Sequence, residues 1–167
     1  ALRALKSRED LFDIHLQNLN WGHTGWIFRD DEERHWLDGL IFKHVKNVHE
    51  TKQPYDMSLQ VTIPNEWKRV TPVDVGYTAG IETTKVASEW VKKSMEMDKI
   101  ILVSNHSKNV YKNTTYVVEN SQTGETIEDF RAFTPMDTVN YPVRNLGNEE
   151  VDIDFDYDFN FLAIAQW

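Results

Sequence analysis

The 167-residue chain contains no cysteine, which excludes a disulfide framework and thiolate metal sites and leaves the cytoplasm as the default location. It has no run of about 18 apolar residues, the length that a membrane-spanning helix needs. Basic residues are scarce, because 18 Lys and Arg stand against 27 Asp and Glu and give a net charge of −9. Nucleic-acid binding depends on cationic contacts to phosphates, so this balance argues against a nucleic-acid partner.

Motifs of several common enzyme classes are also missing. No G-x-S-x-G, P-loop or complete G-x-G-x-x-G occurs, so the hydrolase, NTPase and dinucleotide-enzyme classes find no support. His44 and His49 are five residues apart and lie off a common helical face, which argues against zinc. The acidic residues of 152–158 do not complete an EF-hand, because Tyr157 and Ala163 occupy the positions of its Gly and Glu.

What the chain does contain is enough apolar material for a core, with 40% hydrophobic and 12% aromatic residues. The length predicts one domain and a fragment of another. We expect one domain over residues 1–143. An acidic linker over 144–158 and the first strand of a second domain over 159–167 then follow.

Hydrophobic periodicity predicts strands that alternate with helices. The predicted strands are residues 11–17, 55–63, 72–78, 98–104, 138–143 and 159–165, and the predicted helices are 31–49, 83–97 and 106–112. Such alternation favours an α/β fold with a mainly parallel sheet and flanking helices. Two β-prone runs around Thr123 and Gly124 predict a β-hairpin excursion within residues 115–133.

The predicted helix 31–49 carries both a start signal and an apolar face. Asp30 and Glu33 have the spacing of a capping box. Six residues follow the 3,4 spacing of a buried face, namely Leu37, Leu40, Ile41, His44, Val45 and Val48.

Function in parallel sheets lies at the carboxyl ends of the strands, in the crevice where the strand order reverses. This rule nominates four loops, residues 19–25, 63–67, 78–84 and 104–108.

Four motifs along the chain together resemble a known family. In order they read LNWGHTGW, SLQVTIPNEW, GYTAGIETTK and MDKIILVSNHSKNVY. They are similar to the amino-terminal domain of retaining glycosyltransferases of family four, the GT-B type, and most of all to a subgroup from bacterial, phage and marine environmental sequences. The resemblance covers nearly the whole chain.

The resemblance implies two Rossmann-like domains across a cleft and transfer of a sugar from a nucleotide-sugar donor with retention, without a metal or other cofactor. In that family the donor binds mainly to the second domain. The amino-terminal domain contacts the acceptor, which can be a glycan, a lipid-linked sugar or a small molecule. The family's first strand and donor domain both fall outside the 167 residues, so we expect the fragment alone to be inactive.

Within this resemblance, residues 78–83 occupy the loop where many family members place a His-Asp pair near the reacting sugar. Glu82 is the candidate catalytic residue, and Thr78, Gly80 and Thr83 are candidate substrate contacts. The alternative is that Thr83 or Thr84 caps the following helix, while Glu82 favours its positive end.

Two further loops hold candidate substrate contacts. Ser104 and His106 follow a buried strand and should face the cleft, although Ser104 could equally cap a helix, with Ser107 as the competing cap. Asn20, Trp21 and Gly22 form a loop suited to stacking on a sugar ring, although Trp21 could instead belong to a core. The same two alternatives, a sugar contact or a structural role, apply to Asn65, Glu66 and Trp67.

Two alternatives therefore stand at this point. The first is the acceptor-side domain of a glycosyltransferase, and the second is a non-catalytic carbohydrate-binding or assembly module on the same scaffold. The missing first strand would leave a vacancy beside residues 11–17. We expect residues 159–165 to fill it, within one chain or by exchange between two copies, and a homodimer through exposed strands is the companion expectation.

Overall fold

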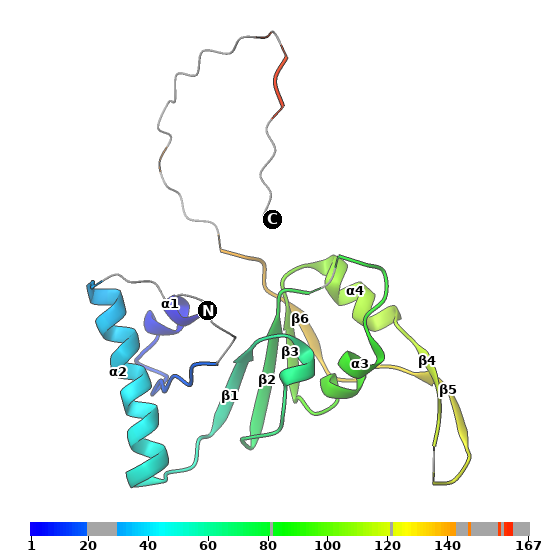
Figure 1. Cartoon of the computed structure of the whole chain (residues 1–167), viewed down its shortest axis with the longest axis horizontal. Coiled ribbons are helices and arrows are strands. Elements are labelled where there is room, and N and C mark those ends of the chain that lie inside the picture. Colours follow the sequence, from blue (N-terminus) through cyan, green and yellow to red (C-terminus); the bar gives the residue numbers. More distant parts are fainter. Residues whose placement is uncertain are drawn as a thin grey trace.

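The computed structural model describes residues 1–19, 30–80, 82–120, 122–142, 147, 157 and 159–161. Its centre is a four-stranded sheet in the order β1-β2-β3-β6, in which every neighbouring pair is parallel (Figure 1). The four strands are β1 (Met57–Val61), β2 (Val73–Thr78), β3 (Lys99–Leu102) and β6 (Met136–Thr138). Helices α3 (Ser88–Ser94) and α4 (Asn105–Asn113) flank the sheet. The predicted α/β class with a parallel sheet is confirmed.

The hydrophobic core lies on the helix-covered face of the sheet. Ile100 and Leu102 of β3 point into it and are 0% exposed. Strand alternation places Gly76 and Thr78 of β2 on the same face, because they pair with Ile100 and Leu102 in the register. The buried cluster consists of Trp67, Val86, Val91, Met97, Ile100, Leu102, Val110, Tyr111, Ala132 and Met136.

The opposite face of the sheet, which we call the open face, is apolar and partly exposed. Met57 and Val61 of β1 and Val73 of β2 are between 44% and 49% exposed. The register pairs Met57 with Val73 and Val61 with Tyr77, so these side chains form adjacent rows. The remaining members of the open face are Leu59, Val75, Lys99, Ile101 and Asp137.

The predicted hairpin is confirmed. β4 (Tyr116–Glu119) and β5 (Thr126–Phe130) pair in antiparallel fashion and extend away from the sheet (Figure 1). The Asn120 side chain accepts a hydrogen bond from the N–H of Gln122 at 2.9 Å, and Gly124 takes the positive φ of +73° that the turn needs.

The N-terminal arm, which we define as the described residues from 1 to 56, lies on the β1 side of the sheet (Figure 1). It contains α1 (Leu2–Lys6), α2 (Glu32–Lys46) and the π-helix η1 (Asn47–Thr51). The predicted helix is confirmed, but its start is one residue later than expected, because Asp31 is the N-cap and accepts from the N–H of Arg34 at 2.9 Å. The predicted buried face is wrong at Val45 and Val48, which are 45% and 49% exposed.

The predicted strand over residues 11–17 is wrong. This segment has no regular secondary structure and runs beside α2, where the N–H of Leu16 donates to the carbonyl of Leu40 at 3.2 Å. The Lys43 ammonium pairs with Asp13, and the His15 ring packs edge-on against Tyr55 at 5.1 Å. The alternating pattern therefore serves contacts to a helix and not a strand ladder.

Other element boundaries also shift. The predicted helix over 83–97 begins only at Ser88, since the N–H of Val86 donates to Thr114 and its carbonyl accepts from Tyr116, which holds this stretch extended. The predicted strand over 138–143 overlaps β6 (Met136–Thr138) only at Thr138 and is wrong for residues 139–142. A 3₁₀ turn, η2 (Pro64–Glu66), forms the short connection after β1.

Most of the predicted linker and final strand lie outside the described residues. Phe159 and Phe161 are described, and they are 73% and 89% exposed without strand structure. In the described part of the segment, nothing fills a vacancy beside residues 11–17.

Candidate functional site

The carboxyl ends of the parallel strands meet at one edge of the sheet, as the strand pattern predicted. The strand order runs in one direction from β1 to β6, so the described strands contain no reversal that would mark a crevice. A cavity of about 280 Å³, which we call the edge cavity, opens instead between the ends of β1 and β2. It is lined by Val61, Thr62, Ile63, Tyr77, Thr78, Ala79 and Tyr141.

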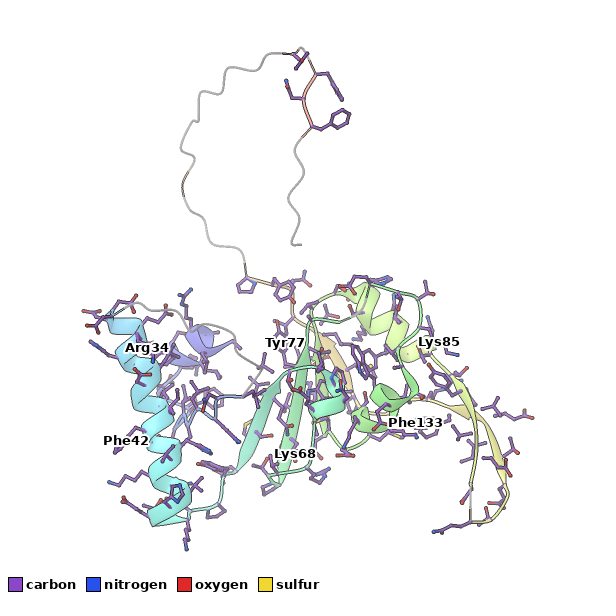
Figure 2. All side chains as sticks on the ribbon, in the orientation of Figure 1. Arg34, Phe42, Lys68, Tyr77, Lys85 and Phe133 are labelled. Carbon is purple, nitrogen blue, oxygen red and sulfur yellow. The ribbon has the colours of Figure 1, made fainter. Side chains whose placement is uncertain are left out.

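Two tyrosines form the aromatic part of the edge cavity. Tyr77 is half-buried near the end of β2 (Figure 2), and Tyr141 is 59% exposed in the segment that follows β6. Burial raises the pKa of the Tyr77 hydroxyl, and the nearby Tyr141 raises it further. Tyr77 is therefore a neutral hydrogen-bond donor at physiological pH, beside an aromatic ring that solvent can reach.

Two buried threonines also line the edge cavity. Thr62 and Thr78 are 7% and 3% exposed, and the N–H of Thr62 donates to the carbonyl of Tyr77 at 3.2 Å. The Thr62 hydroxyl donates to the carboxylate of Glu66, which ties the η2 turn to the end of β1. The cavity wall is thus fixed by contacts within the protein, and rigid walls favour ligand binding.

Gly80 has the positive φ that the sequence suggested, at +94°. A Cβ at this position would lie 2.1 Å from the Oγ of Ser107. The group that approaches Gly80 closely is therefore the first turn of α4 and not an open ligand space. This contact fixes the β2–α3 loop against α4.

Ser104 is the N-cap of α4, because its Oγ accepts from the N–H of Ser107 at 3.1 Å. The sequence analysis left this capping role open as the alternative to a ligand contact. It also named Ser107 as a competing N-cap, but Ser107 instead donates its backbone N–H to the Ser104 cap. His106 lies exposed in the first turn of the same helix. The Thr138 hydroxyl donates to the Asn105 side chain at 3.0 Å, so the end of β6 and the start of α4 are also joined.

The loop after Gly80 carries two more predicted residues. Thr83 donates through its hydroxyl to the carbonyl of Lys85 at 3.0 Å. The N-cap of α3 is Ala87, so the alternative that Thr83 or Thr84 caps this helix is wrong. Glu82 is exposed, which leaves its carboxylate accessible to a ligand at the edge of the sheet.

The residues of the 63–67 loop divide between solvent and core. Trp67 is fully buried and its ring lies against Gly76, where an added Cβ would be 2.7 Å from two ring carbons. Trp67 is thus a core residue and not a stacking surface. Asn65 and Glu66 are exposed, and Asn65 remains a candidate contact beside the edge cavity.

Several predicted positions cannot be placed. Asn20, Trp21 and Gly22 lie outside the described residues, as do Ile81 and most of the acidic segment 152–158. Among the residues that the structure describes, no group of three His, Asp or Glu side chains could hold a metal ion. Within the same ranges, no helix is long and apolar enough to cross a membrane.

The structure brings Thr78 of the predicted set to the edge cavity, together with residues that the sequence analysis missed. The sequence analysis placed Thr62, Tyr77 and Tyr141 in predicted strands and gave none of them a binding role, and the observed β6 ends before Tyr141. The strand pairing is what identifies Tyr77 as a residue of the functional edge. Val61 pairs with Tyr77, so an aromatic side chain is paired with the last residue of the neighbouring strand at the functional edge.

Comparison with known proteins adds no relative. No family model matches the sequence, and neither a curated protein nor a solved structure matches it significantly. The geometry of the chain and the sequence resemblance are therefore the basis for a functional proposal.

Proposed function

We propose that this chain is the acceptor-side domain of a retaining GT-B glycosyltransferase and that its own task is to bind a sugar unit of the acceptor in the edge cavity. The observation that carries the proposal is the chemistry of this cavity. Two tyrosines and two threonines line a hollow at the carboxyl ends of two parallel strands. That is the edge at which open parallel sheets bind their ligands.

The side chains of the edge cavity suit a carbohydrate. The apolar face of a sugar ring packs against an aromatic ring, and its hydroxyls need hydrogen-bond partners. Tyr77 and Tyr141 supply ring faces, and the Tyr77 hydroxyl supplies a hydrogen-bonding group. The volume of about 280 Å³ is near the lower end of ligand pockets, so the cavity fits a small unit of a longer acceptor.

Glu82 is the proposed catalytic residue, because it is an exposed carboxylate in the loop that leaves β2 next to the cavity. In the family that the chain resembles, the nucleotide-sugar donor binds mainly to a second domain. We therefore assign acceptor binding to this chain. Glu82 would lie where the bound acceptor meets the donor sugar.

Acceptor binding can be tested with methyl glycosides of common hexoses and N-acetylhexosamines, detected by saturation-transfer NMR. Tyr77→Ala should weaken binding about tenfold, since it removes a ring face and a hydroxyl. Phe133→Ala is the matched control, because Phe133 is 77% exposed before β6 and outside the edge cavity. Equal losses in both variants, or no binding of any glycoside, would contradict the proposal.

A second candidate function is a carbohydrate-binding module without catalysis. The contact between Gly80 and Ser107 favours it, because the space at the positive-φ glycine is taken by the protein itself. Titration of the full-length protein with UDP- and GDP-sugars separates the two candidates. Donor binding followed by transfer, with turnover lowered by Glu82→Gln, supports the enzyme. Glycan binding without nucleotide affinity supports the module.

A further inference from the structure

The wall of the edge cavity is largely aliphatic. Val61 is the last residue of β1, Ile63 follows it two residues later, and Ala79 is the first residue after β2. Val61 and Ile63 are 49% and 40% exposed, and Ala79 is exposed as well. Among the described residues that line the cavity, none carries a formal charge. A ligand that enters the cavity therefore meets more apolar than polar surface.

The aliphatic side chains lie on one side of the chain. The backbone is extended at Ile63, with φ of −71° and ψ of 144°, and the N–H of Thr62 donates to the carbonyl of Tyr77 beyond the end of β1. The strand alternation thus continues to Ile63 and places it on the side of Val61, which pairs with Tyr77 in the register. The two aliphatic side chains and the Tyr77 ring belong to the same side of the sheet.

Few polar side chains of the wall are free to bind a ligand. The Thr62 hydroxyl is engaged, because it donates to the carboxylate of Glu66. Thr78 is 3% exposed and pairs with Leu102 on the core face of the sheet. The hydroxyls of Tyr77 and Tyr141 are therefore the side-chain groups of the wall that remain for hydrogen bonds with a ligand.

We infer that the edge cavity selects a sugar unit that presents a methyl group, as 6-deoxy sugars and N-acetylated sugars do, and that Val61 and Ile63 form the wall against which this methyl group packs. The inference rests on the proposed function, because it names the acceptor unit that the same cavity takes. Both kinds of sugar supply the same chemistry, an apolar methyl group on an otherwise polar ring.

The physical reason is the hydration of the sugar hydroxyls. A hydroxyl that is pressed against an aliphatic wall loses its hydrogen bonds to water and gains none in return. A methyl group at the same wall displaces water that is loosely held there, which favours binding. A hexose with a hydroxyl at every position thus fits this wall less well than a sugar that turns a methyl group toward it.

Selection between such similar sugars needs a wall that does not rearrange. Ile63 precedes the η2 turn, and its carbonyl accepts from the N–H of Glu66 at 3.0 Å. Ala79 precedes Gly80, which is held against the first turn of α4 by its close contact with Ser107. Both ends of the aliphatic wall are therefore fixed before a ligand binds, and a preformed wall favours selective binding.

The test is the dissociation constant of matched methyl glycosides, measured on the whole chain by heteronuclear NMR titration. Parent hexosides of gluco, galacto and manno configuration are each compared with their 6-deoxy and their N-acetamido derivative, so the methyl group of the aglycone is common to all. In at least one configuration a derivative should bind about fivefold more tightly than its parent, near the lower limit for a methyl group in an apolar site because this wall is half exposed. The two kinds of derivative show which methyl group the cavity takes.

Val61→Thr is the deciding variant, because threonine has nearly the shape of valine and adds a hydroxyl to the wall. It should abolish the preference for the methyl-bearing sugar, since the parent hexoside then finds a hydrogen-bond partner. Val73→Thr is the matched control. Val73 lies on the same face of the sheet, is 44% exposed and lies outside the edge cavity, so this variant should keep the preference of the wild type.

The outcomes separate the inference from the proposed function. Tighter binding of a methyl-bearing sugar, lost in Val61→Thr and kept in Val73→Thr, supports the inference. Parent hexosides that bind as tightly as their derivatives, or a preference that Val61→Thr leaves unchanged, would overturn it while sugar binding by the edge cavity stands. Binding of no glycoside at all would overturn the proposed function and the inference together.

Discussion

The two halves of this molecule use their apolar residues in different ways. The sheet with α3 and α4 encloses a cluster of ten buried apolar residues, whereas the only buried residue among those described in the N-terminal arm is the polar Asn47. The contrast between α2 and α4 makes the point. α2 has fifteen residues and buries none, while the nine-residue α4 buries Val110 and Tyr111.

The difference shows that a helical apolar pattern determines the helix but not its burial. α4 follows β3 directly and is tied back to the sheet through the Thr138–Asn105 hydrogen bond. α2 is instead fixed to the irregular segment that precedes it, through the Leu16–Leu40 and Asp13–Lys43 contacts. Which surface a helix covers depends on these anchors, and matched substitutions in the two halves can measure their energetic consequence.

The largest expected contrast concerns two tryptophans. Trp67 is fully buried and donates through Nε1 to the carbonyl of Gln60 at 3.2 Å, so Trp67→Ala should lower the free energy of unfolding by about 3–5 kcal/mol. Trp36 lies half-buried on α2, where Lys6 is 4.6 Å from its ring, and Trp36→Ala should lower it by only about 1 kcal/mol. Urea unfolding measures both. Similar losses would mean that the N-terminal arm carries a core of its own.

The next contrast concerns two carboxylates. Asp74 is fully buried at the start of β2 and accepts hydrogen bonds from Ser58, from Thr71 and from the N–H of Val70. Asp74→Ala leaves these donors unpaired and should lower the free energy of unfolding by about 2–3 kcal/mol at neutral pH. Asp38 forms an exposed pair with Arg34 one turn away on α2, so Asp38→Ala should cost no more than about 0.5 kcal/mol.

The pH dependence of stability checks the origin of the Asp74 effect. Burial alone would raise the pKa of Asp74, but the hydrogen bonds from Ser58, Thr71 and Val70 outweigh it and lower the pKa below its ordinary value. A lowered folded-state pKa gives stability that is present above the unfolded pKa of about 3.9 and is lost as the pH falls through the folded value. The difference between wild type and Asp74→Ala should therefore shrink below about pH 4. A difference that stays constant would point to packing alone.

The sequence predicted the half of the fold in which local pattern and tertiary context agree. β1, β2, β3, α4 and the hairpin followed from apolar runs, a Ser cap and a turn around Thr123 and Gly124. The segment 11–17 could not be assigned correctly, because strand-like alternation also fits a chain that lies along a helix. The late start of α3 depends on Thr114 and Tyr116, which are distant in sequence and hold Val86 extended.

The sequence predicted where on the sheet the candidate site lies, but it did not predict most of the residues that line it. The carboxyl edge followed from the strand pattern, and Thr78 lies there as expected. Tyr141 joins it only through the path of the chain after β6, which the pattern does not encode. Ser104 and Gly80 were recognised as special positions, but their partners turned out to be Ser107 and the α4 turn. A cap and a ligand contact need the same residue types, so sequence alone could not separate them.

A third contrast differs in sign, and it concerns two glycines. Gly76 in β2 faces Trp67, where an added Cβ would lie 2.7 Å from the ring, so Gly76→Ala should lower the free energy of unfolding by about 1–3 kcal/mol. Gly39 lies in the middle of α2 with no atom within 4 Å of an added Cβ. Gly39→Ala should therefore raise the free energy of unfolding by about 0.5–1 kcal/mol, because alanine loses less conformational entropy in a helix. Thermal unfolding of the two variants, at a concentration where both have the same oligomeric state, gives the comparison. If both substitutions destabilised the protein, α2 would have to be packed against a surface at Gly39, and the division of the molecule into a packed and an uncovered half would fail.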